Sequence, residues 1–237
     1  MTSTEMDQEF LILYDKVTNF DAPGYTEQER SIFLTKGQQR TFFSLYNPLG
    51  NQIREGFEET EARRKDLRAL VKGVTLSTPS SSQIGTLPNG VFFDLPEDCL
   101  YVISEEVTTT STEACKNNLR LRVKPTTHDE YAINVKNPFK KPNVTRYVWR
   151  LDLQQNRNEI ITDGTFDIAE YHLRYIERLT PIIVGSNTVD GVAGPQDCLL
   201  DEIIHKRIIE EAVKIATGIT DPEFYQIKTI EQKDGES

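Results

Sequence analysis

Apolar residues recur every three or four positions through the first third of the chain, which is the spacing of one face of an α-helix. The first such stripe consists of Met6, Phe10, Leu13, Tyr14 and Val17. The Ala22-Pro23-Gly24 turn ends this helix, and Thr26 with Glu29 has the spacing of a capping box that opens a second one. The second helix is expected to reach Tyr46, because the turn sequence Asn47-Pro48-Leu49-Gly50 follows it.

A third helix is expected from about Ile53 to Val71. Its centre, EETEARRKDLR, is densely charged with both signs. Such a face is either exposed to solvent or paired with charges across a subunit boundary.

Short runs rich in β-branched and aromatic residues replace the helical period after the turn-rich segment STPSSSQIGTLPNG, which begins at Ser77. Alternation of apolar and polar residues is clearest in Leu119–Val123 and Tyr147–Leu151. The pattern predicts an antiparallel sheet, or a small sandwich, with one solvated face. Strands are expected within residues 90–95, 99–111, 119–125, 130–135, 146–153, 159–166 and 170–184.

The helical period returns after Gly194-Pro195, with an apolar face made of Leu200, Ile204, Ile208, Ala212, Ile215 and Ile219. The sequence therefore predicts an α+β fold in which an N-terminal helical hairpin or bundle is closed by a C-terminal helix, with a central antiparallel β insertion between them. The expected regions are residues 1–76 (helical), 77–194 (β insertion), 195–219 (closing helix) and 220–237 (a polar tail).

Composition changes this picture mainly through charge. The formal net charge is −10, and the hydrophobic fraction of 37% and the mean hydropathy of −0.49 indicate a modest core. An acidic chain is a poor ligand for duplex DNA, but its surface suits DNA that must pass without adhering. Three widely spaced cysteines predict reduced thiols in a cytosol-like compartment. Neither a signal peptide nor a membrane-spanning run is recognisable.

Candidate catalytic and metal-binding residues do not combine into a site. His128-Asp129-Glu130 is the densest cluster, but His172 and His205 are far away in the sequence and no cysteine adjoins any of the three histidines. The cluster is expected to be a polar turn between strands. No nucleophile motif or phosphate-binding loop is present. We therefore expect neither enzyme activity, nor a metal, nor a cofactor.

The basic segment Lys136-Asn137-Pro138-Phe139-Lys140-Lys141-Pro142 is more informative. Two prolines stiffen it, and polar neighbours exclude Phe139 from an alternating strand face. An aromatic residue on a stiff loop can anchor a neighbouring protein, and Lys136, Pro138, Phe139, Lys140 and Lys141 are candidate interface residues. Two alternatives remain: Phe139 folds back on its own core, or it stacks on a base of single-stranded nucleic acid.

Trp149, the single tryptophan, is expected to anchor the core of the β region. Arg146 and Arg150 would then lie on the opposite, solvated face of the same strand, either as ordinary surface pairs or facing acids of an adjacent subunit.

Three segments together resemble the head-to-tail connector proteins of tailed bacteriophages, and specifically the ring proteins of crAss-like phages. The first is EFLILYDKVTNFDAPGYTEQERSIFLTKGQQRTF, the second VKPTTHDEYAINVKNPFKKPNVTRYVWRLD, and the third LLDEIIHKRIIEEAVKIA. The resemblance covers most of the chain in order. One departure is Gly37, where the pattern leads us to expect alanine; the second helix is therefore either locally soft or closely packed at this point.

The resemblance implies a structural virion protein that is made in the host cytoplasm and forms a homo-oligomeric ring, typically dodecameric, at the head-to-tail junction. It implies binding to the portal protein, extension of the DNA channel with transient contact to passing DNA, docking of a further neck or tail protein, and no membrane contact. The mixed-charge helix and the last helix would supply interface residues: Glu58, Glu61, Arg63, Arg64 and His205. The alternatives are another neck component, such as a tail-completion protein, and a single-strand nucleic-acid-binding module that uses the NPFKKP loop.

Overall fold

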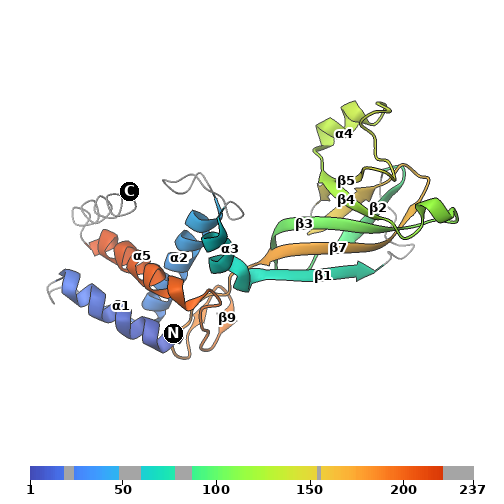
Figure 1. Ribbon diagram of the computed structural model, residues 1–237. Helices are drawn as coiled ribbons and strands as arrows, with labels where there is room; N and C mark the ends of the chain where they lie inside the picture. The colour runs from blue at the N-terminus through green and yellow to red at the C-terminus, as the bar shows by residue number, and fades with distance from the viewer. Residues whose placement is uncertain (19–23, 48–59, 78–86, 154–155, 221–237) are drawn as a thin grey trace. The chain divides into compact units, whose positions relative to one another are not determined.

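The computed structural model describes residues 1–18, 24–47, 60–77, 87–153 and 156–220, and these form the α+β fold that the sequence predicts (Figure 1). The chain divides into two compact units. The helical unit comprises Met1–Leu70 and Leu179–Ser237, and the sheet unit comprises Val71–Arg178. The sheet unit is thus inserted between two parts of the helical one.

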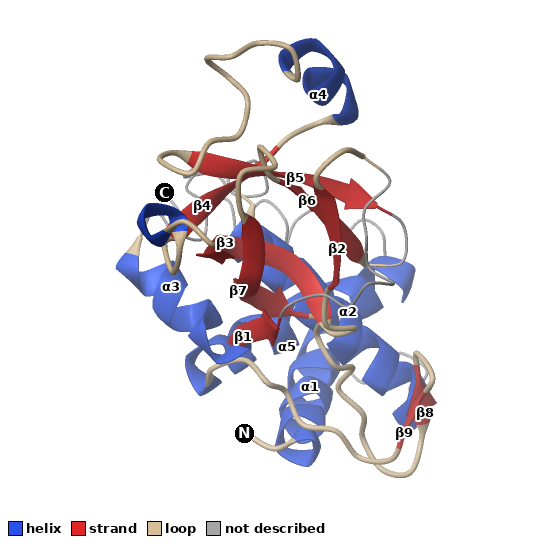
Figure 2. Ribbon diagram, turned by 90° about the vertical axis from the view of Figure 1, so that its right-hand side faces the viewer, coloured by secondary structure: helices blue, strands red, loops and turns tan. Residues whose placement is uncertain are grey.

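The helical unit is built around α5 (Glu202–Thr220), which packs against both α1 (Ser3–Thr18) and α2 (Glu27–Tyr46). The closing helix is therefore the centre of the bundle rather than a lid on a finished N-terminal hairpin. A hairpin of β8 (Thr188–Val189) and β9 (Val192–Ala193) completes this unit (Figure 2). The predicted apolar faces are confirmed at these buried positions: Met6, Phe10, Tyr14, Leu200, Ile204, Ile208 and Ala212.

The start of α2 and its closest contact both follow from single residues. The Thr26 hydroxyl accepts the Glu29 backbone N–H at 3.3 Å, and the Glu29 carboxylate accepts the Thr26 N–H at 2.8 Å, so the predicted capping box is confirmed. At Gly37 the backbone of α5 is so near that a Cβ atom would lie 2.5 Å from the carbonyl oxygen of Ile208. Close packing, and not local softness, accounts for this glycine.

The third helix is shorter than the prediction. The structure contains α3 (Glu61–Leu67) and a 3-10 turn at Arg68–Leu70, after which β1 (Val71–Ser77) begins. Extending the helix to Val71 was wrong because β1 pairs with β7 along its whole length. The expected residues 53–59 of the helix and 78–86 of the linker lie outside the described residues.

The described strands of the sheet unit form one seven-stranded sheet in the order β1-β7-β3-β4-β5-β6-β2. The bounds of the remaining strands are β2 (Gly90–Asp94), β3 (Cys99–Thr110), β4 (Arg120–Pro125), β5 (Tyr147–Leu153), β6 (Arg157–Ile161) and β7 (Asp167–Glu177). The sheet is mixed, because β4 and β5 run parallel; the prediction of a purely antiparallel sheet was wrong at this pair.

The parallel pairing of β4 and β5 also explains why a helix replaces one of the expected strands. Parallel neighbours need a crossover connection, and here it contains α4 (His128–Asn134). The strand expected at residues 130–135 is therefore a helix. Tyr131, Ile133 and Val135 have the period of a strand, but Thr127 accepts the Glu130 N–H at 3.2 Å and starts a helix instead.

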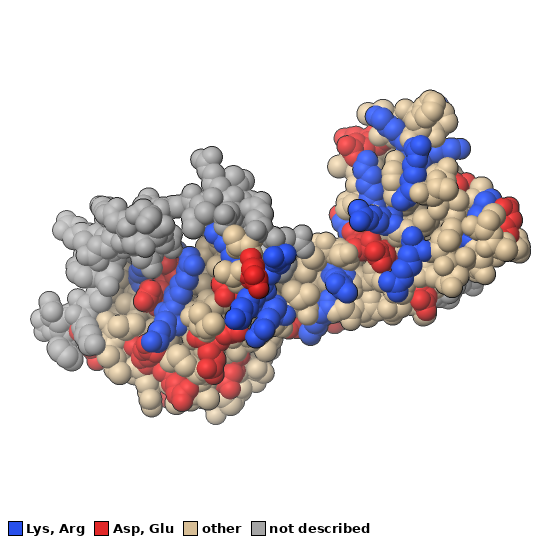
Figure 3. Space-filling model, in the orientation of Figure 1, with Lys and Arg blue, Asp and Glu red and all other residues tan. Residues whose placement is uncertain are grey.

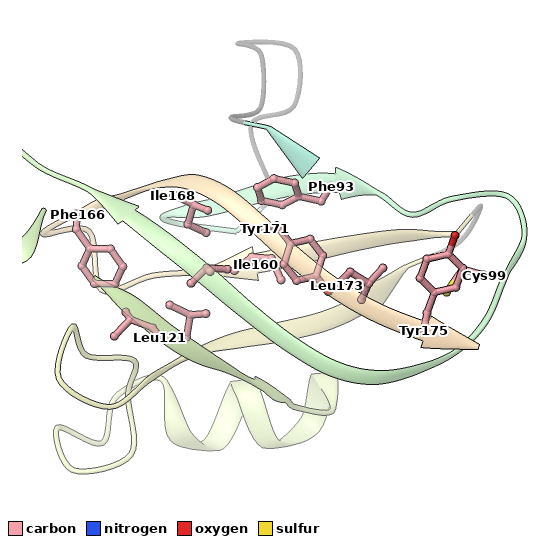
Figure 4. Close-up of a cluster of buried hydrophobic side chains, with 11 residues drawn as sticks. Phe93, Cys99, Leu121, Ile160, Phe166, Ile168, Tyr171, Leu173 and Tyr175 are labelled. Carbon is pink, nitrogen blue, oxygen red and sulfur yellow. The ribbon is translucent and has the colours of Figure 1, made fainter. Parts of the chain in front are cut away.

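The sheet curls so that strands distant in its order share one core. Phe93 of β2 lies at one edge of the order, yet its ring is 5.1 Å from that of Tyr171 of β7, centroid to centroid (Figure 4). The buried core residues of the sheet unit are Phe93, Cys99, Val107, Leu121, Val148, Ile160, Phe166, Ile168, Tyr171, Leu173 and Tyr175. Curling buries one face of a single sheet without a second layer.

A charged group lies inside this unit. Arg150 was expected on a solvated face, but it is buried and forms an ion pair with Glu105 of β3, and a second one with Asp152 at 2.8 Å. The Tyr171 hydroxyl donates to the other oxygen of Glu105 at 2.5 Å. Burial raises the pKa of Glu105, whereas the nearby Arg150 lowers it.

The boundaries of the two units differ from the expected regions. The sheet unit starts at Val71 rather than at residue 77 and ends at Arg178 rather than at residue 194. The β8–β9 hairpin accordingly belongs with the helices. None of the described helices combines the length and the apolar character of a membrane span.

Candidate docking surface

Helix α4 begins with the residues that looked most like a catalytic or metal site. Thr127 caps it, and His128, Asp129 and Glu130 form its exposed first turn. The two acids lie at the positive end of the helix dipole, which accounts for their position without a ligand. His128, Asp129 and Glu130 are thus a helix start and not the polar turn that the sequence suggested.

One aromatic contact holds α4 on the sheet. The Tyr131 ring meets the Trp149 ring edge to face, with centroids 5.8 Å apart and an interplanar angle of 80°. Trp149 is buried with Leu151 and Ile161, and Tyr131, Leu87 and Tyr147 pack around them. The predicted role of Trp149 as a core anchor is confirmed, and this small cluster is the base of the crossover.

The loop after α4 has a fixed backbone. The Asn137 side-chain oxygen accepts the Phe139 N–H at 3.0 Å, and the Asn137 carbonyl accepts the N–H groups of Lys140 and Lys141 at 3.1 and 3.0 Å. Arg146 donates to the Phe139 carbonyl at 2.9 Å, and the Tyr147 hydroxyl donates to the Lys140 carbonyl at 2.8 Å. These bonds hold the main chain and leave the side chains free to point outward.

The exposed side chains of α4 and this loop form what we call the docking patch: Ile133, Val135, Lys136, Phe139, Lys140 and Lys141. Ile133 is 75% exposed, Val135 40% and Phe139 79%. Lys136, Lys140 and Lys141 are also exposed, and the space-filling view shows several basic side chains, with some acidic ones, at this end of the sheet unit (Figure 3). The alternative in which Phe139 folds back on its own core does not fit its exposure.

The remaining candidate interface residues lie in the helical unit. Glu61 and Arg64 are exposed on α3, Arg63 is half-buried, and Glu58 lies outside the described residues. His205 is 2% exposed, and its Nε2 donates to the Leu200 carbonyl at 2.9 Å. Its side chain therefore contributes to the interior of the unit and not to its surface.

The other reactive groups have structural environments. His172 shares hydrogen bonds with the hydroxyls of Thr75 and Thr108, at 3.0 and 2.7 Å, and so links three neighbouring strands. Burial raises the pKa of Cys99 and of Cys198 to about 11, which makes both thiols weak nucleophiles at neutral pH. Among the residues that the structure describes, no group of three or more His, Cys, Asp and Glu side chains could hold a metal ion.

Comparison with known proteins identifies the family. Residues 1–222 match the family described as phage tail ring protein 3/4. The chain belongs to this family of phage ring proteins. Over 227 residues it is 30% identical to ring protein 4/5 of Bacteroides phage crAss001, an alignment covering 91% of this chain and 92% of that protein. It is also 28% identical to ring protein 3 of the same phage over 221 residues, which cover 91% and 95% of the two chains.

The resemblance to ring proteins of crAss-like phages is thus confirmed over nearly the whole length. Both relatives are ring proteins, so this ring protein is a structural component of the phage tail or neck and has its place in the virion. The similarity extends through both compact units, because the matched residues include the whole sheet unit.

Proposed function

We propose that this ring protein assembles at the head-to-tail junction, binds the portal, extends the DNA channel and presents a docking surface to the next neck or tail component. The family membership supports the ring, and the net charge of −10 supports a channel that DNA passes without adhering. A dodecameric homo-oligomer fits the resemblance from which the proposal started. Catalysis has no part in this function.

The observation that carries the docking function is the exposure of Phe139 on a fixed backbone. A large aromatic side chain in water is a cost to the isolated subunit, but it is suited to fill a pocket of a neighbour. Because its loop is already ordered by hydrogen bonds from Arg146 and Tyr147, little conformational entropy is lost on binding. The three surrounding lysines fit the polar rim of an interface and favour an acidic partner surface.

The test compares full-length variants for incorporation into the neck. We expect Phe139→Ala/Ile133→Ala to keep its fold and its ring and to lose association with the adjacent neck protein, measured by co-purification and by electron microscopy of neck complexes. The matched control Lys136→Arg/Lys140→Arg/Lys141→Arg retains the charge and is expected to associate normally. Normal docking by the apolar variant would refute the role of the patch.

An oligonucleotide-binding assay and the position of the protein in the virion separate the alternatives. A single-strand nucleic-acid-binding module would show salt-dependent binding of oligonucleotides that Phe139→Ala/Lys140→Glu abolishes. A tail-completion protein would occupy a different axial position in the virion, with a different copy number. The proposal requires a ring adjoining the portal, so a position elsewhere in the tail would overturn it.

A further inference from the structure

Two stripes on the helices of the helical unit have the same spacing and opposite charge, and their residues are exposed except for Glu9, which is half-buried. The acidic stripe lies on α1 and consists of Glu5, Gln8, Glu9 and Ile12. The basic stripe lies on α2 and consists of Lys36, Gln39, Arg40 and Phe43. Both have the same residue types at the same spacing: a charged residue at position i, glutamine at i+3, a second charged residue at i+4 and a large apolar residue at i+7.

Each stripe faces away from the core of its own unit. On α1 the residues Met6, Phe10 and Tyr14 are buried, while Glu5 and Gln8 are exposed and Ile12 is 54% exposed. On α2 the exposed fraction of Phe43 is 47%, and Lys36, Gln39 and Arg40 are exposed. The exposed parts of Ile12 and Phe43 are accessible to a partner.

The two stripes complement each other position by position. If α1 and α2 of different subunits lie side by side and parallel, Glu5 is matched to Lys36 and Glu9 to Arg40. In the same alignment Gln8 lies beside Gln39, and Ile12 lies beside Phe43.

We infer that the acidic stripe of one copy packs against the basic stripe of the next copy around the ring, an inference that rests on the proposed ring assembly. A closed ring needs two different, mutually complementary surfaces on every subunit, and these stripes are such a pair. Each exposed ion pair is weak by itself, but the apolar pair adds burial and the contact is repeated at every subunit boundary.

Charge reversal tests the pairing directly in the full-length protein. The α1 variant is Gln8→Lys/Glu9→Lys, which spares Glu5 because its carboxylate accepts the Thr2 N–H at 2.8 Å. The α2 variant is Gln39→Glu/Arg40→Glu. Gln8, Gln39 and Arg40 are exposed and Glu9 is half-buried. Circular dichroism verifies that each variant is folded.

In either variant alone, the contact between two neighbouring copies is expected to be weaker by a factor on the order of ten, because both stripes then carry charges of the same sign. An equimolar mixture is expected to recover rings, because each variant complements the other and not itself. Native mass spectrometry should then show strictly alternating rings with an even number of subunits. The combined four-residue variant should form rings unaided.

The possible outcomes separate the pairing of the two stripes from the proposed ring assembly on which it rests. Wild-type rings from either variant alone, or no recovery in the mixture, would overturn the pairing of the stripes while the ring function stands. Rings of normal composition that no longer join other neck proteins would assign the stripes to a contact between different proteins and would also overturn it. A wild-type chain that forms no ring, alone or with its neck proteins, would refute both.

Discussion

Gly37 shows how one missing side chain determines the approach of two helices. The position lacks a Cβ atom where the backbone of α5 passes, at Ile208 and Ala212. In an exposed helix, alanine would be more stable than glycine by up to about 1 kcal/mol. Here the added atom would lie 2.5 Å from a carbonyl oxygen and 2.9 Å from a backbone nitrogen, so the helices must separate.

We therefore expect Gly37→Ala to lower the free energy of unfolding by about 1–3 kcal/mol, measured by urea denaturation. Gln28→Ala, an exposed change on the same helix outside the basic stripe, is the control and should change stability by no more than a few tenths of a kcal/mol. A Gly37→Ala variant as stable as the parent would contradict the close packing.

The buried Glu105 gives a pH dependence with a definite sign. Burial raises its pKa above the ordinary value of 4.5, so the folded protein binds this proton more tightly than the unfolded protein does. The contribution of Glu105 to stability is therefore greatest below pH 4.5 and declines as the pH rises through the raised pKa.

The Glu105→Gln variant removes this titration. Between about pH 4 and pH 7 we expect the stability of the parent to fall relative to that of Glu105→Gln, measured as the urea midpoint at each pH. Arg150 limits the effect, because its charge favours the ionised carboxylate. Parallel pH profiles for the two proteins would show that Glu105 titrates normally in the fold.

At the scale of elements, α4 depends on one aromatic contact that can be followed optically. Trp149 is the single tryptophan, so its fluorescence reports on the Tyr131 ring packed against it. We expect Tyr131→Ala to admit water to the indole and shift its emission to the red, with the sheet still folded by circular dichroism. Ile133→Ala, on the exposed side of the same helix, should leave the emission unchanged.

The sequence pattern predicts the strands in which apolar and polar residues alternate. It fails where hydrogen bonding to a strand distant in the sequence determines the structure. The alternation in β4 and β5 placed both strands correctly. β1 could not be predicted, because VKGVTLS has a glycine at its third position and follows a charged helical stretch. Its pairing with β7 along its whole length stabilises the strand despite its weak β-propensity. α4 was predictable from the Thr127-x-x-Glu130 spacing, but the period-two apolar residues after it favoured a strand.

The sequence also indicated some residues of the candidate docking surface and missed others. The exposure of Phe139 and its lysines follows from the sequence, because polar neighbours and two prolines excluded a buried strand. Ile133 and Val135 were missed, since a strand interpretation would have buried them. Arg150 was placed in solvent, because nothing local shows that Glu105, far away in the sequence, reaches it through the curl of the sheet.

At the scale of the whole molecule, the sheet unit is an insertion whose two ends lie side by side. Val71 pairs with Ile176, and Lys72 of β1 forms an ion pair with Glu177 of β7. We expect residues 71–178, expressed alone, to fold with a cooperative thermal transition and the Trp149 emission of the full chain. An isolated fragment without a cooperative transition would show that the sheet unit depends on the helical unit.

The parallel pairing of β4 and β5 has a consequence for how such proteins can diversify. The sheet fixes both ends of the crossover from β4 to β5. The crossover itself must only be long enough to lead from the end of β4 back to the start of β5. Residues 126–146 can therefore be exchanged, lengthened or tagged as a cassette while the strand order is kept. The two ring proteins of Bacteroides phage crAss001 that resemble this chain could thus share its scaffold and differ in this single segment.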